Sequence, residues 1–477
     1  MDKQILNNCR HIHFIGIGGS GMYPLAQILH AKGCFLTGSD NNETETLRAV
    51  REMGIPVYLG QRAENIGDAD LIVHTAAILP DNPELIAAKS SGAAVWERSQ
   101  LLGVLTEQFG NTINVSGTHG KTTVTAMITQ ILVTHGLDIS AVIGGKLPLI
   151  GGSGIAGKSD IMVCEACEFQ DHFLNLKTSA AVVLNIDEDH LDYFKSLDNI
   201  IKSFRKFCAD ADKAVIINGD DKNSMRAAEG LDKSKIITFG RSERNDWYPA
   251  NICRKSGMET LFDIMHNGTL FCSTALHIPG EHNIVNAVAA AAAADYAGAS
   301  PEGIAKGLES FRGAGRRFEK YGEAGGITVV DDYAHHPAEI AATLGSAVKL
   351  GFKKVWAVHQ PFTFSRTELL LEDFAKALSI ADKVVLTSIM GGREVNTTGI
   401  TASALAAKTA GAVCFDREHD ESIELVSRYV SENAEDGDLI VTLGCGDVNK
   451  AARRILELLK EKYPNSPAEG KPCERMI

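Results

Sequence analysis

The chain has 477 residues, which is too long for one ordinary hydrophobic core, so two to four domains are expected. Hydrophobic residues make up 44% of the chain and charged residues 22%, a composition typical of soluble globular proteins. Acidic residues outnumber basic residues by 60 to 47, and the resulting charge of −13 argues against a general nucleic-acid-binding surface.

The N-terminus has no basic-then-apolar signal pattern, and no apolar stretch reaches about 18 residues. We therefore expect a cytoplasmic protein with no membrane partner. The ten cysteines are scattered, and Cys164 and Cys167 form the only CxxC pair. A redox or zinc pair is one interpretation of this spacing, but reduced thiols are favoured because there is no second CxxC.

Short β-branched runs alternate with amphipathic stretches along nearly the whole chain, which predicts an α/β fold with mostly parallel sheets. In the first part, the pattern predicts a helix over about 21–32 and strands over 11–16, 35–40, 57–60 and 69–78. Residues 93–107 then close this first unit near residue 106.

The second unit begins with a strand over 111–117 and a helix over 121–135. The pattern then predicts strands over 161–166, 180–187 and 213–219, a strand-rich excursion over about 236–278, and a helix over 282–298. The glycine-containing stretch 312–318 is expected to be a linker. The third unit has predicted strands that begin near residues 327, 354, 383 and 438, and the tail 464–477 is expected to be disordered.

The sequence therefore predicts three consecutive α/β domains. Residues 1–106 are expected to form a Rossmann-like domain, residues 107–313 a central domain with a P-loop, and residues 314–477 a second Rossmann-like domain.

A turn that is suited to binding phosphate joins the first strand and helix of the central domain. Gly117-Thr118-His119-Gly120 follows the strand, and Lys121-Thr122-Thr123 opens the helix. Glycines allow backbone N–H groups to converge on phosphate oxygens, and the helix N-terminus adds partial positive charge. Lys121 would reach the terminal phosphates and the Thr122 hydroxyl would bind Mg²⁺. Only two residues separate the glycines, and Val115 replaces the usual outer glycine, so the motif is a shortened variant.

A second glycine turn lies near the N-terminus. Residues 16–21 read Gly-Ile-Gly-Gly-Ser-Gly between a predicted strand and a helix, and Asp40 lies 19 residues beyond Gly21. This spacing matches the dinucleotide-binding fingerprint, in which the acidic residue binds ribose hydroxyls. On its own it suggests a nicotinamide-dependent dehydrogenase, but no other domain offers an obvious hydride-transfer site. The same geometry can bind any diphosphate, including that of a UDP-sugar.

Eight motifs occur in an order that resembles the Mur ligases over roughly residues 10–455: GIGGSGM, GSD, GTHGKTT, NIDEDHLDY, GEHNIVNA, GRRFE, DDYAHHP and FSRT. The opening turn, the histidine of GTHGKTT and the DDYAHHP element are most similar to the branch that adds L-alanine to UDP-N-acetylmuramate. This resemblance implies that ATP phosphorylates the substrate carboxylate and that L-alanine attacks the acyl phosphate. It implies an enzyme of peptidoglycan precursor synthesis that uses ATP and Mg²⁺, as a monomer or homodimer.

The resemblance also assigns roles to the two glycine turns. The residues expected to bind the UDP-sugar are Gly16, Gly18, Gly19, Ser20, Gly21, Ser39, Asp40 and Thr75. Those expected to bind ATP are Gly117, Thr118, His119, Gly120, Lys121, Thr122, Thr123, Asn283, Asn286, Arg317 and Asp332. Thr75 is equally consistent with an inert strand-end residue, and Asn283 with a helix N-cap.

The family positions that bind metal correspond here to Glu165 and His190, together with Thr122 of the phosphate loop. A helix-capping or core histidine is the alternative reading of His190. The residues expected to take part in catalysis are Lys121, Glu165, His190, Arg317 and His335.

The sequence departs from the family pattern after Glu165. Many relatives read Glu-Ala-Asp-Glu-Ser-Asp, whereas this chain has Cys167, Phe169 and Gln170 at the third, fifth and sixth positions. Sister ligases carry a carbamylated lysine farther along, where an ungapped count places Arg205, so that modification is not expected.

The L-alanine pocket is expected to contain Tyr333, His335 and Arg366, because arginine can bind a carboxylate with two hydrogen bonds. Phe362 and Thr363 replace a histidine and an arginine of some relatives. Arg316 and His336 are interpreted as structural residues.

Three other functions remain as alternatives. A recycling ligase would join a whole tripeptide to the same nucleotide sugar, and a nicotinamide dehydrogenase would bind its cofactor at the first glycine turn. A non-catalytic ATP-binding regulator would not need Lys121 for its function.

Overall fold

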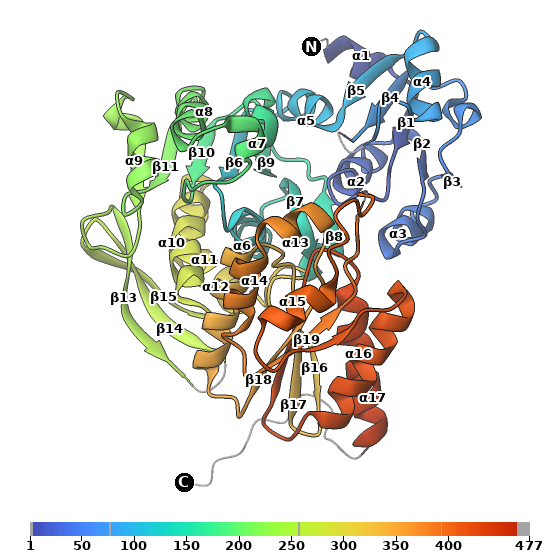
Figure 1. Ribbon diagram of the computed structural model, residues 1–477. Helices are drawn as coiled ribbons and strands as arrows, with labels where there is room; N and C mark the ends of the chain where they lie inside the picture. Colours follow the sequence, from blue (N-terminus) through green and yellow to red (C-terminus); the bar gives the residue numbers. More distant parts are fainter. Residues whose placement is uncertain (1–2, 76–77, 256–257, 393, 465–477) are drawn as a thin grey trace. The chain divides into compact units, whose positions relative to one another are not determined.

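The computed structural model describes residues 3–75, 78–255, 258–392 and 394–464, and it contains three β-sheets flanked by helices (Figure 1). This architecture confirms the predicted α/β class. The chain divides into two compact units, of which the first comprises residues 1–253, 261–276 and 282–314 and the second the remainder. The tail 464–477 was predicted to be disordered; apart from Pro464, it lies outside the described residues. Within the described ranges, no helix has the length and apolar character needed to cross a membrane.

The first sheet is parallel throughout and has the strand order β3-β2-β1-β4-β5. Its strands are β1 (His11–Ile15), β2 (Phe35–Asp40), β3 (Val57–Leu59), β4 (Leu71–His74) and β5 (Ala94–Glu97). Its helices are α1 (Lys3–Asn8), α2 (Tyr23–Ala31), α3 (Glu45–Glu52), η1 (Ala63–Ile66), α4 (Pro83–Ser90) and α5 (Arg98–Thr106). The strand order reverses between β1 and β4, which is where doubly wound sheets bind ligands at the carboxyl ends of their strands.

The second sheet has ten strands in the order β15-β14-β13-β12-β11-β10-β6-β9-β7-β8. These strands are β6 (Asn111–Ser116), β7 (Ser140–Leu147), β8 (Gly152–Ile155), β9 (Ile161–Glu165), β10 (Ala180–Val183), β11 (Ala214–Asn218), β12 (Ile236–Phe239), β13 (Trp247–Arg254), β14 (Thr260–His266) and β15 (Thr269–Leu276). The predicted strand-rich excursion therefore supplies β12 to β15. The strand β6, which leads into the phosphate loop, is central and pairs with β9 and β10.

The helices of this part cover a largely buried sheet. They are α6 (Lys121–Thr134), η2 (Pro148–Ile150), η3 (Phe169–Asn175), α7 (Leu191–Phe194), α8 (Leu197–Ala209), α9 (Lys222–Ala228), η4 (Lys233–Lys235), α10 (Glu281–Tyr296) and α11 (Pro301–Ser310). Eight consecutive residues of α10, 287–294, are buried, and seven of them are alanines. Its last residue, Tyr296, donates a hydrogen bond of 2.9 Å to the Asn111 side chain at the start of β6.

The third sheet has the order β16-β17-β21-β18-β19-β20, and only β16 runs antiparallel to its neighbour. Its strands are β16 (Glu319–Ala324), β17 (Ile327–Asp332), β18 (Val355–His359), β19 (Lys383–Thr387), β20 (Val413–Phe415) and β21 (Leu439–Leu443). Its helices are α12 (Pro337–Ala347), η5 (Val348–Leu350), α13 (Phe364–Leu369), α14 (Leu371–Leu378), α15 (Ala402–Lys408), α16 (His419–Asn433) and α17 (Val448–Lys462). Successive residues Val329 and Val330 enter separate hydrophobic cores, so both faces of the sheet are buried.

Candidate active site

The N-terminal glycine turn is held by the end of β2. The amides of Gly16 and Ile17 donate to the Ser39 carbonyl at 2.8 and 3.0 Å, and the Gly18 amide donates to Asp40 Oδ2 at 3.0 Å. Gly16 has φ of +85°, which favours glycine. The structure therefore brings the predicted acidic residue Asp40 directly onto the turn.

The other predicted residues of this turn have different surroundings. The Gly19 amide donates to the Gly16 carbonyl at 3.1 Å, and Ser20 is exposed. A Cβ atom added to Gly16 would lie 3.3 Å from Thr75 Cγ2, so Thr75 is in contact with the turn. Ser39 is fully buried, and its hydroxyl donates to Glu84 Oε2 at 2.6 Å. Its predicted contact with the nucleotide stays a prediction.

Sequence reasoning missed Arg98, which follows β5 directly. A Cβ atom added to Gly21 would lie 2.9 Å from Arg98 Cδ, so this glycine allows the arginine to pass close to the turn. The position at the carboxyl end of a parallel strand was the available signal.

The phosphate loop connects β6 to α6 and contains two glycines with positive φ, Gly117 at +145° and Gly120 at +88°. Asn185, which follows β10, braces the residues between them. Its carbonyl accepts from the Thr118 amide at 3.0 Å, and its side chain accepts from the His119 amide at 2.8 Å and donates to the His119 carbonyl at 3.0 Å. Asn185 comes from a segment 66 residues away. It is the first residue of the NIDEDHLDY motif and follows a buried strand, and these were its two sequence signals.

Lys121 lies folded against its own loop. Its Nζ donates to the carbonyls of Gly117 at 2.5 Å and Thr118 at 3.2 Å, and to Glu168 Oε1 at 2.9 Å. Burial is the largest single influence on Lys121 and lowers its pKa, but the charge and hydrogen bond of Glu168 together with the charges of Cys167 and Glu165 make the net shift upward. The other carboxylate oxygen of Glu168 is buried and has no hydrogen-bond partner among the described residues. Lys121 therefore carries its charge into the loop.

Glu165 is fixed at the end of β9. Its Oε1 accepts from the Thr122 hydroxyl at 3.0 Å, and its Oε2 accepts from the Gly144 amide at 2.7 Å. The predicted pair of Thr122 and Glu165 is thus in direct contact. Thr123, the next residue of α6, is buried.

His190 belongs to a second group of potential metal ligands. Ligand atoms of Glu168, Asp189 and His190 lie within 4.8 Å of one another, and this group does not include Glu165. His190 has φ of +52°, and its ring packs against Phe169 with a centroid distance of 4.7 Å. Carboxylates and imidazole can bind a divalent cation, and Glu168 links this group to Lys121.

The two predicted adenine-contacting residues lie near the phosphate loop. Asn286 Nδ2 donates to Asn283 Oδ1 at 3.1 Å, and a Cβ atom added to Gly120 would lie 3.1 Å from Asn286 Oδ1. Asn283 is buried at the start of α10. The helix therefore places an amide side chain directly beside the loop.

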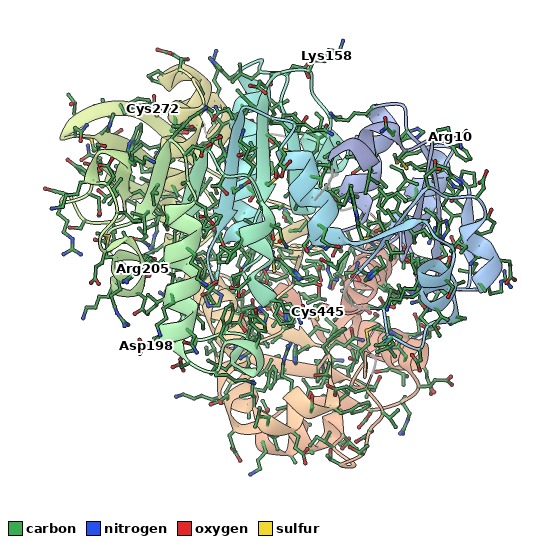
Figure 2. The ribbon with its side chains drawn as sticks, turned by 90° about the horizontal axis from the view of Figure 1, so that it is seen from above. Arg10, Lys158, Asp198, Arg205, Cys272 and Cys445 are labelled. Atoms are coloured by element: carbon green, nitrogen blue, oxygen red, sulfur yellow. The ribbon has the colours of Figure 1, made fainter. Side chains whose placement is uncertain are left out.

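Gln170 of the substituted segment has an unusual backbone conformation, and Arg205 of α8 has structural partners. Gln170 has φ of +53°. Arg205 lies on α8, as does Asp198 (Figure 2). Arg205 Nη2 donates to the Arg226 carbonyl at 2.5 Å, and Arg226 in turn binds Asp198 at 2.7 Å. These contacts join α8 to α9.

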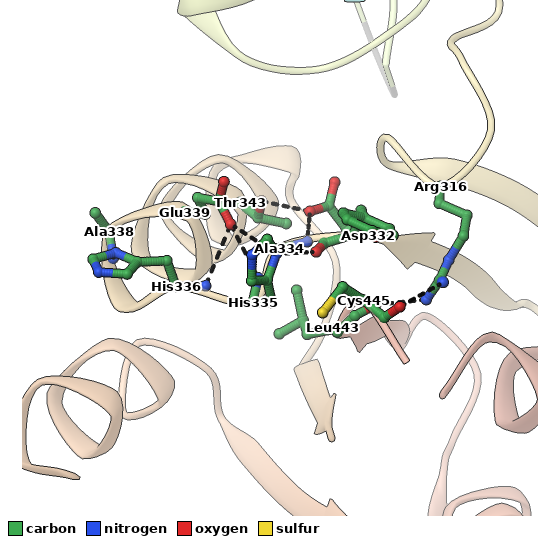
Figure 3. A network of polar contacts seen from close by, with 12 residues as sticks. Arg316, Asp332, Ala334, His335, His336, Ala338, Glu339, Thr343, Leu443 and Cys445 are labelled. Carbon is green, nitrogen blue, oxygen red and sulfur yellow. Dashed lines mark hydrogen bonds and ion pairs between the residues drawn. The ribbon is translucent and has the colours of Figure 1, made fainter. Parts of the chain in front are cut away.

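In the second compact unit, Asp332 is the last residue of β17 and lies beside Ala334 and Thr343 (Figure 3). Its side chain is buried. Its carboxylate accepts hydrogen bonds from the amides of Phe318 at 2.8 Å and Ala334 at 2.9 Å and from the Thr343 hydroxyl at 3.2 Å. Burial raises the pKa of Asp332 to about 6, although the charge of Arg317 opposes this shift. The predicted pair of Asp332 and Arg317 is therefore electrostatically coupled.

His335 and Tyr333 lie next to one another, with ring centroids 5.6 Å apart in an edge-on arrangement. His335 Nδ1 lies 3.1 Å from the Tyr333 carbonyl, and Glu339 Oε2 accepts from the His335 amide at 3.0 Å (Figure 3). Burial lowers the pKa of His335, with a smaller contribution from Arg366. Burial also raises the pKa of Tyr333. Sequence reasoning missed Glu339, which holds the histidine loop one helical turn away.

The predicted amino-acid-binding residues are thus close enough to interact. Arg366 on α13 also acts on Cys445, whose pKa burial raises to about 11. The guanidinium carbon of Arg317 lies 5.3 Å from the Tyr333 ring centroid. The structure brings Tyr333, His335, Arg366 and Arg317 into one cluster.

Arg316 and His336, which we interpret as structural residues, both have hydrogen-bond partners within their own compact unit. Arg316 donates to Asp331 Oδ2 at 2.9 Å and to the carbonyls of Gly444 at 2.5 Å and Gly446 at 2.9 Å. His336 is the N-cap of α12 and accepts from the Ala338 amide at 3.4 Å.

Three family models match consecutive parts of the chain. The Mur ligase family catalytic domain matches residues 11–110, the Mur ligase middle domain matches residues 115–294, and the Mur ligase glutamate ligase domain matches residues 316–446.

Similar proteins cover almost the same length. The UDP-N-acetylmuramate–L-alanine ligase of Caldanaerobacter subterraneus is 40% identical over 95% of this chain and 98% of its own. That of Caldicellulosiruptor bescii is 42% identical over 93% of this chain and 98% of its own. Among solved structures, the UDP-N-acetylmuramate-alanine ligase of Thermotoga maritima superposes with a TM-score of 0.81 at 27% identity, covering 95% of this chain and 99% of the other. A murein peptide ligase of Psychrobacter arcticus shares the fold, with a TM-score of 0.71, 24% identity and coverage of 96% and 100%.

Proposed function

Because the chain belongs to the Mur ligase family, we propose that it joins L-alanine to UDP-N-acetylmuramate and converts ATP to ADP and phosphate, as a step of peptidoglycan precursor synthesis. The single observation that carries the proposal is identity of 40–42% over nearly the whole chain to ligases of that name. The phosphate loop with Lys121 and the adjoining acidic and histidine side chains supports the same chemistry.

The reaction has two steps in this proposal. An oxygen of the substrate carboxylate attacks the γ-phosphorus of ATP, the bond to the bridging oxygen breaks, and ADP leaves. The nitrogen of L-alanine then attacks the acyl carbon, loses a proton, and displaces phosphate. Both steps depend mainly on position and on neutralised charge, which Lys121 and the loop amides supply at the terminal phosphates.

The residues present fit a divalent cation. Glu168 has a buried carboxylate oxygen without a hydrogen-bond partner in the described part of the chain, and it lies with Asp189 and His190 in a group of potential ligands. Thr122 and Glu165 would hold a cation at the loop itself. Bound Mg²⁺ would neutralise phosphate charge. The chain's own groups would hold the nucleotide and orient the carboxylate.

For the second step, Arg366 would bind the carboxylate of L-alanine, while Tyr333 and His335 orient it. Burial keeps His335 neutral near pH 7, since it lowers the pKa of the imidazole. A neutral imidazole can accept the proton that the attacking amine loses. Arg317 and Asp332 would act near the γ-phosphate.

The three parts of the chain would divide the substrates. We assign UDP-sugar binding to residues 1–106, ATP binding to residues 107–313 and amino-acid binding to residues 314–477. The sheets support this division, because β5 ends at Glu97 before β6 starts at Asn111, and β16 starts at Glu319. We further propose a cytoplasmic protein that acts as a monomer or homodimer.

Phosphate release from ATP and Mg²⁺ tests the proposal, measured with UDP-N-acetylmuramate and a panel of amino acids. We expect release only when the nucleotide sugar and an amino acid are both present, fastest with L-alanine and slower with glycine or L-serine. A competition assay against the tripeptide distinguishes the recycling reaction. Turnover with the tripeptide but with none of the three amino acids would contradict the proposal.

A further inference from the structure

A chain of polar side chains runs through the N-terminal sheet from the surface to the first glycine turn. Histidines of β1 and hydroxyl residues of β2 share one face of the sheet, because alternate residues of a strand point the same way. In order, the members of this polar chain are Asp68, His11, Thr37, His13, Glu84 and Ser39.

Five contacts connect these six side chains without a gap. His11 Nδ1 lies 2.8 Å from Asp68 Oδ1, and His11 Nε2 lies 2.8 Å from the Thr37 hydroxyl. The same hydroxyl lies 2.7 Å from His13 Nδ1.

The inner half of the polar chain is closed off from solvent. His13 Nε2 lies 2.8 Å from Glu84 Oε1, and Ser39 donates to Glu84 Oε2 at 2.6 Å. The side chains of His13 and Glu84 are 0% exposed, whereas that of Asp68 is 96% exposed. A buried polar group without a hydrogen-bond partner is costly, so each inner contact needs a hydrogen atom.

Counting hydrogens shows how many protons the polar chain contains. Five contacts require five hydrogens, and the Ser39 and Thr37 hydroxyls supply one each. Two neutral imidazoles supply two more, because each carries one N–H. When the carboxylates of Asp68 and Glu84 act only as acceptors, the fifth hydrogen is an additional proton on His11 or His13.

The Thr37 hydroxyl can pass this proton between the two rings. When His11 holds it, His11 Nε2 donates to Thr37, and Thr37 donates to His13 Nδ1. If His11 gives its Nε2 proton to the Thr37 oxygen while Thr37 gives its own to His13 Nδ1, every contact keeps one hydrogen. The positive charge then lies on His13, beside Glu84, and no atom leaves the polar chain.

We infer that His11 and His13 share one proton beyond two neutral imidazoles, and that this charged pair positions Ser39 beneath the glycine turn. The link to the turn is direct, since the Ser39 carbonyl accepts from the amides of both Gly16 and Ile17. A charged His13 fixes Glu84, and Glu84 fixes the Ser39 side chain. His11, Thr37, His13 and Glu84 are therefore positioning residues, and their effect on the UDP-sugar rests on the proposed function.

The other charged groups near the pair lie at its outer end. The Asp70 carboxylate accepts from the His11 amide at 3.1 Å and from the Arg10 amide at 2.8 Å. The His11 hydrogen bond lowers the pKa of Asp68, so Asp68 is an ionised acceptor at neutral pH. On the inner side, the Tyr58 ring centroid lies 6.4 Å from that of His13.

Nitrogen-15 NMR of the full chain labelled at histidine tests the shared proton without any substrate. At pH 7 we expect the His11 and His13 rings to carry three N–H protons in total, assigned by the signals lost in His11→Gln and His13→Gln. Thr37→Val removes the shared hydroxyl and should leave two neutral rings, whereas Thr37→Ser should restore the parent pattern. Two neutral rings in the unaltered protein would overturn the inference.

A surface substitution gives a second test that does not disturb the core. Asp68→Ala frees His11 Nδ1 from its need to donate, so the additional proton should be lost; Asp81→Ala, at another exposed position of the same sheet unit, should change nothing. An unchanged proton count in Asp68→Ala would contradict the hydrogen count.

The positioning role has its own measurements. In Thr37→Val, we expect KM for UDP-N-acetylmuramate to rise roughly tenfold, the size expected for one lost charged hydrogen bond, while KM for ATP stays constant. The Gly16 and Ile17 amides should also exchange hydrogen faster, and this readout remains valid if the protein is not a ligase. Unchanged exchange in a variant that has lost the proton would overturn the positioning role.

Discussion

The ammonium group of Lys121 and the carboxylate of Glu168 form an ion pair at 2.9 Å, inside the loop that joins β6 to α6. The lysine side chain is 17% exposed and that of the glutamate 4%. Because Lys121 also contacts two loop carbonyls, a phosphate that enters the loop must compete with groups that already surround its charge. The ion pair therefore fixes the position of the Lys121 ammonium group and sets the free energy needed to move it onto a phosphate.

Lys121→Ala should lower kcat by roughly 100- to 1,000-fold, the range measured when one donor to developing charge is removed. The physical reason is that the transferred phosphoryl group loses its nearest cation. Phosphate release under saturating substrates is the measurement. Lys158→Ala serves as a control, because Lys158 is exposed on a loop between β8 and β9 (Figure 2). An unchanged kcat in Lys121→Ala would remove Lys121 from the phosphoryl-transfer step.

His190→Ala should raise the Mg²⁺ concentration that gives half-maximal activity by roughly tenfold or more, in the range seen for altered metal surroundings. The imidazole lies with Glu168 and Asp189 in the group of potential ligands, so its loss removes one donor. Titration with Mn²⁺, followed by electron paramagnetic resonance, measures binding separately from turnover. His135→Ala, at the C-terminal end of α6, is the matched control. If Mn²⁺ affinity does not change, His190 has the alternative role of a structural histidine.

Protonation of Asp332 should make kcat/KM for ATP fall as the pH drops below about 6. Burial raises the pKa of this carboxyl from 3.8 to about 6, so the charge is lost as the pH falls through about 6. We expect this fall in kcat/KM to be absent in Asp332→Asn, whose activity is lower throughout. Asp420→Asn, exposed at the start of α16, should keep the fall.

The same shift has a defined effect on stability. Because the folded state binds the Asp332 proton more tightly than the unfolded chain, the contribution of this group to stability falls as pH rises from 3.8 to about 6. Asp332→Asn should therefore flatten the stability curve in this window. If kcat/KM for ATP still falls below about pH 6 in Asp332→Asn, another group causes that fall.

Arg366→Ala should raise KM for L-alanine by roughly 100-fold, the effect of truncating one partner of a hydrogen-bonded charge pair. KM for ATP should stay nearly constant, which separates a pocket residue from a general loss of folding. Arg366→Lys should recover only part of the affinity, since lysine cannot form the two-pronged contact. Arg417→Ala, exposed in the same compact unit, is the control. An unchanged KM for L-alanine would remove Arg366 from the pocket.

His359 should destabilise the protein in acid. Burial lowers the pKa of this imidazole from 6.5 to about 4, and its Nε2 has no hydrogen-bond partner among the described residues. Stability contributed by neutral His359 is present above pH 6.5 and is lost as pH falls toward 4, by on the order of 3 kcal/mol at most.

His359→Gln should reduce this loss, because an amide can still donate to the Leu443 carbonyl but does not titrate. Calorimetric melting at pH 5 and pH 7 gives the comparison, with His30→Gln as a half-exposed control. An equal fall in melting temperature for the parent and His359→Gln would contradict the assignment.

The local geometry of the two glycine turns could be predicted, because neighbours along the chain form them. Residues 116–123 hold a strand end, a turn and a helix start in one stretch, so the phosphate loop could be predicted from local rules. The first glycine turn and Asp40 could be predicted because the Rossmann spacing relates them. The contacts of Asn185 and Glu339 could not be predicted, because only the folded chain brings Asn185 of the NIDEDHLDY motif to its loop, and Glu339 looks like an ordinary first-turn acid of α12.

Edge strands and cysteines were harder to interpret. β16 reads Glu-Lys-Tyr-Gly-Glu-Ala, which has too few apolar residues to predict a strand, yet it pairs with β17 as an antiparallel edge. The CxxC spacing suggested zinc or redox chemistry as one option. Both cysteines are free thiols, and burial raises the pKa of Cys164, which makes an inert core thiol the better interpretation.

The alanines of α10 have a geometric consequence. Asn286 lies beside Gly120 at one end of β6, and ten residues later Tyr296 binds Asn111 at the other end, a helical span of about 15 Å. Methyl side chains let α10 pack closely against its neighbours. The length of the helix therefore fixes the distance between its contact at Gly120 and its contact at Asn111. A larger side chain in the middle of α10 would therefore move Asn286 away from Gly120, although the substituted position lies outside the loop.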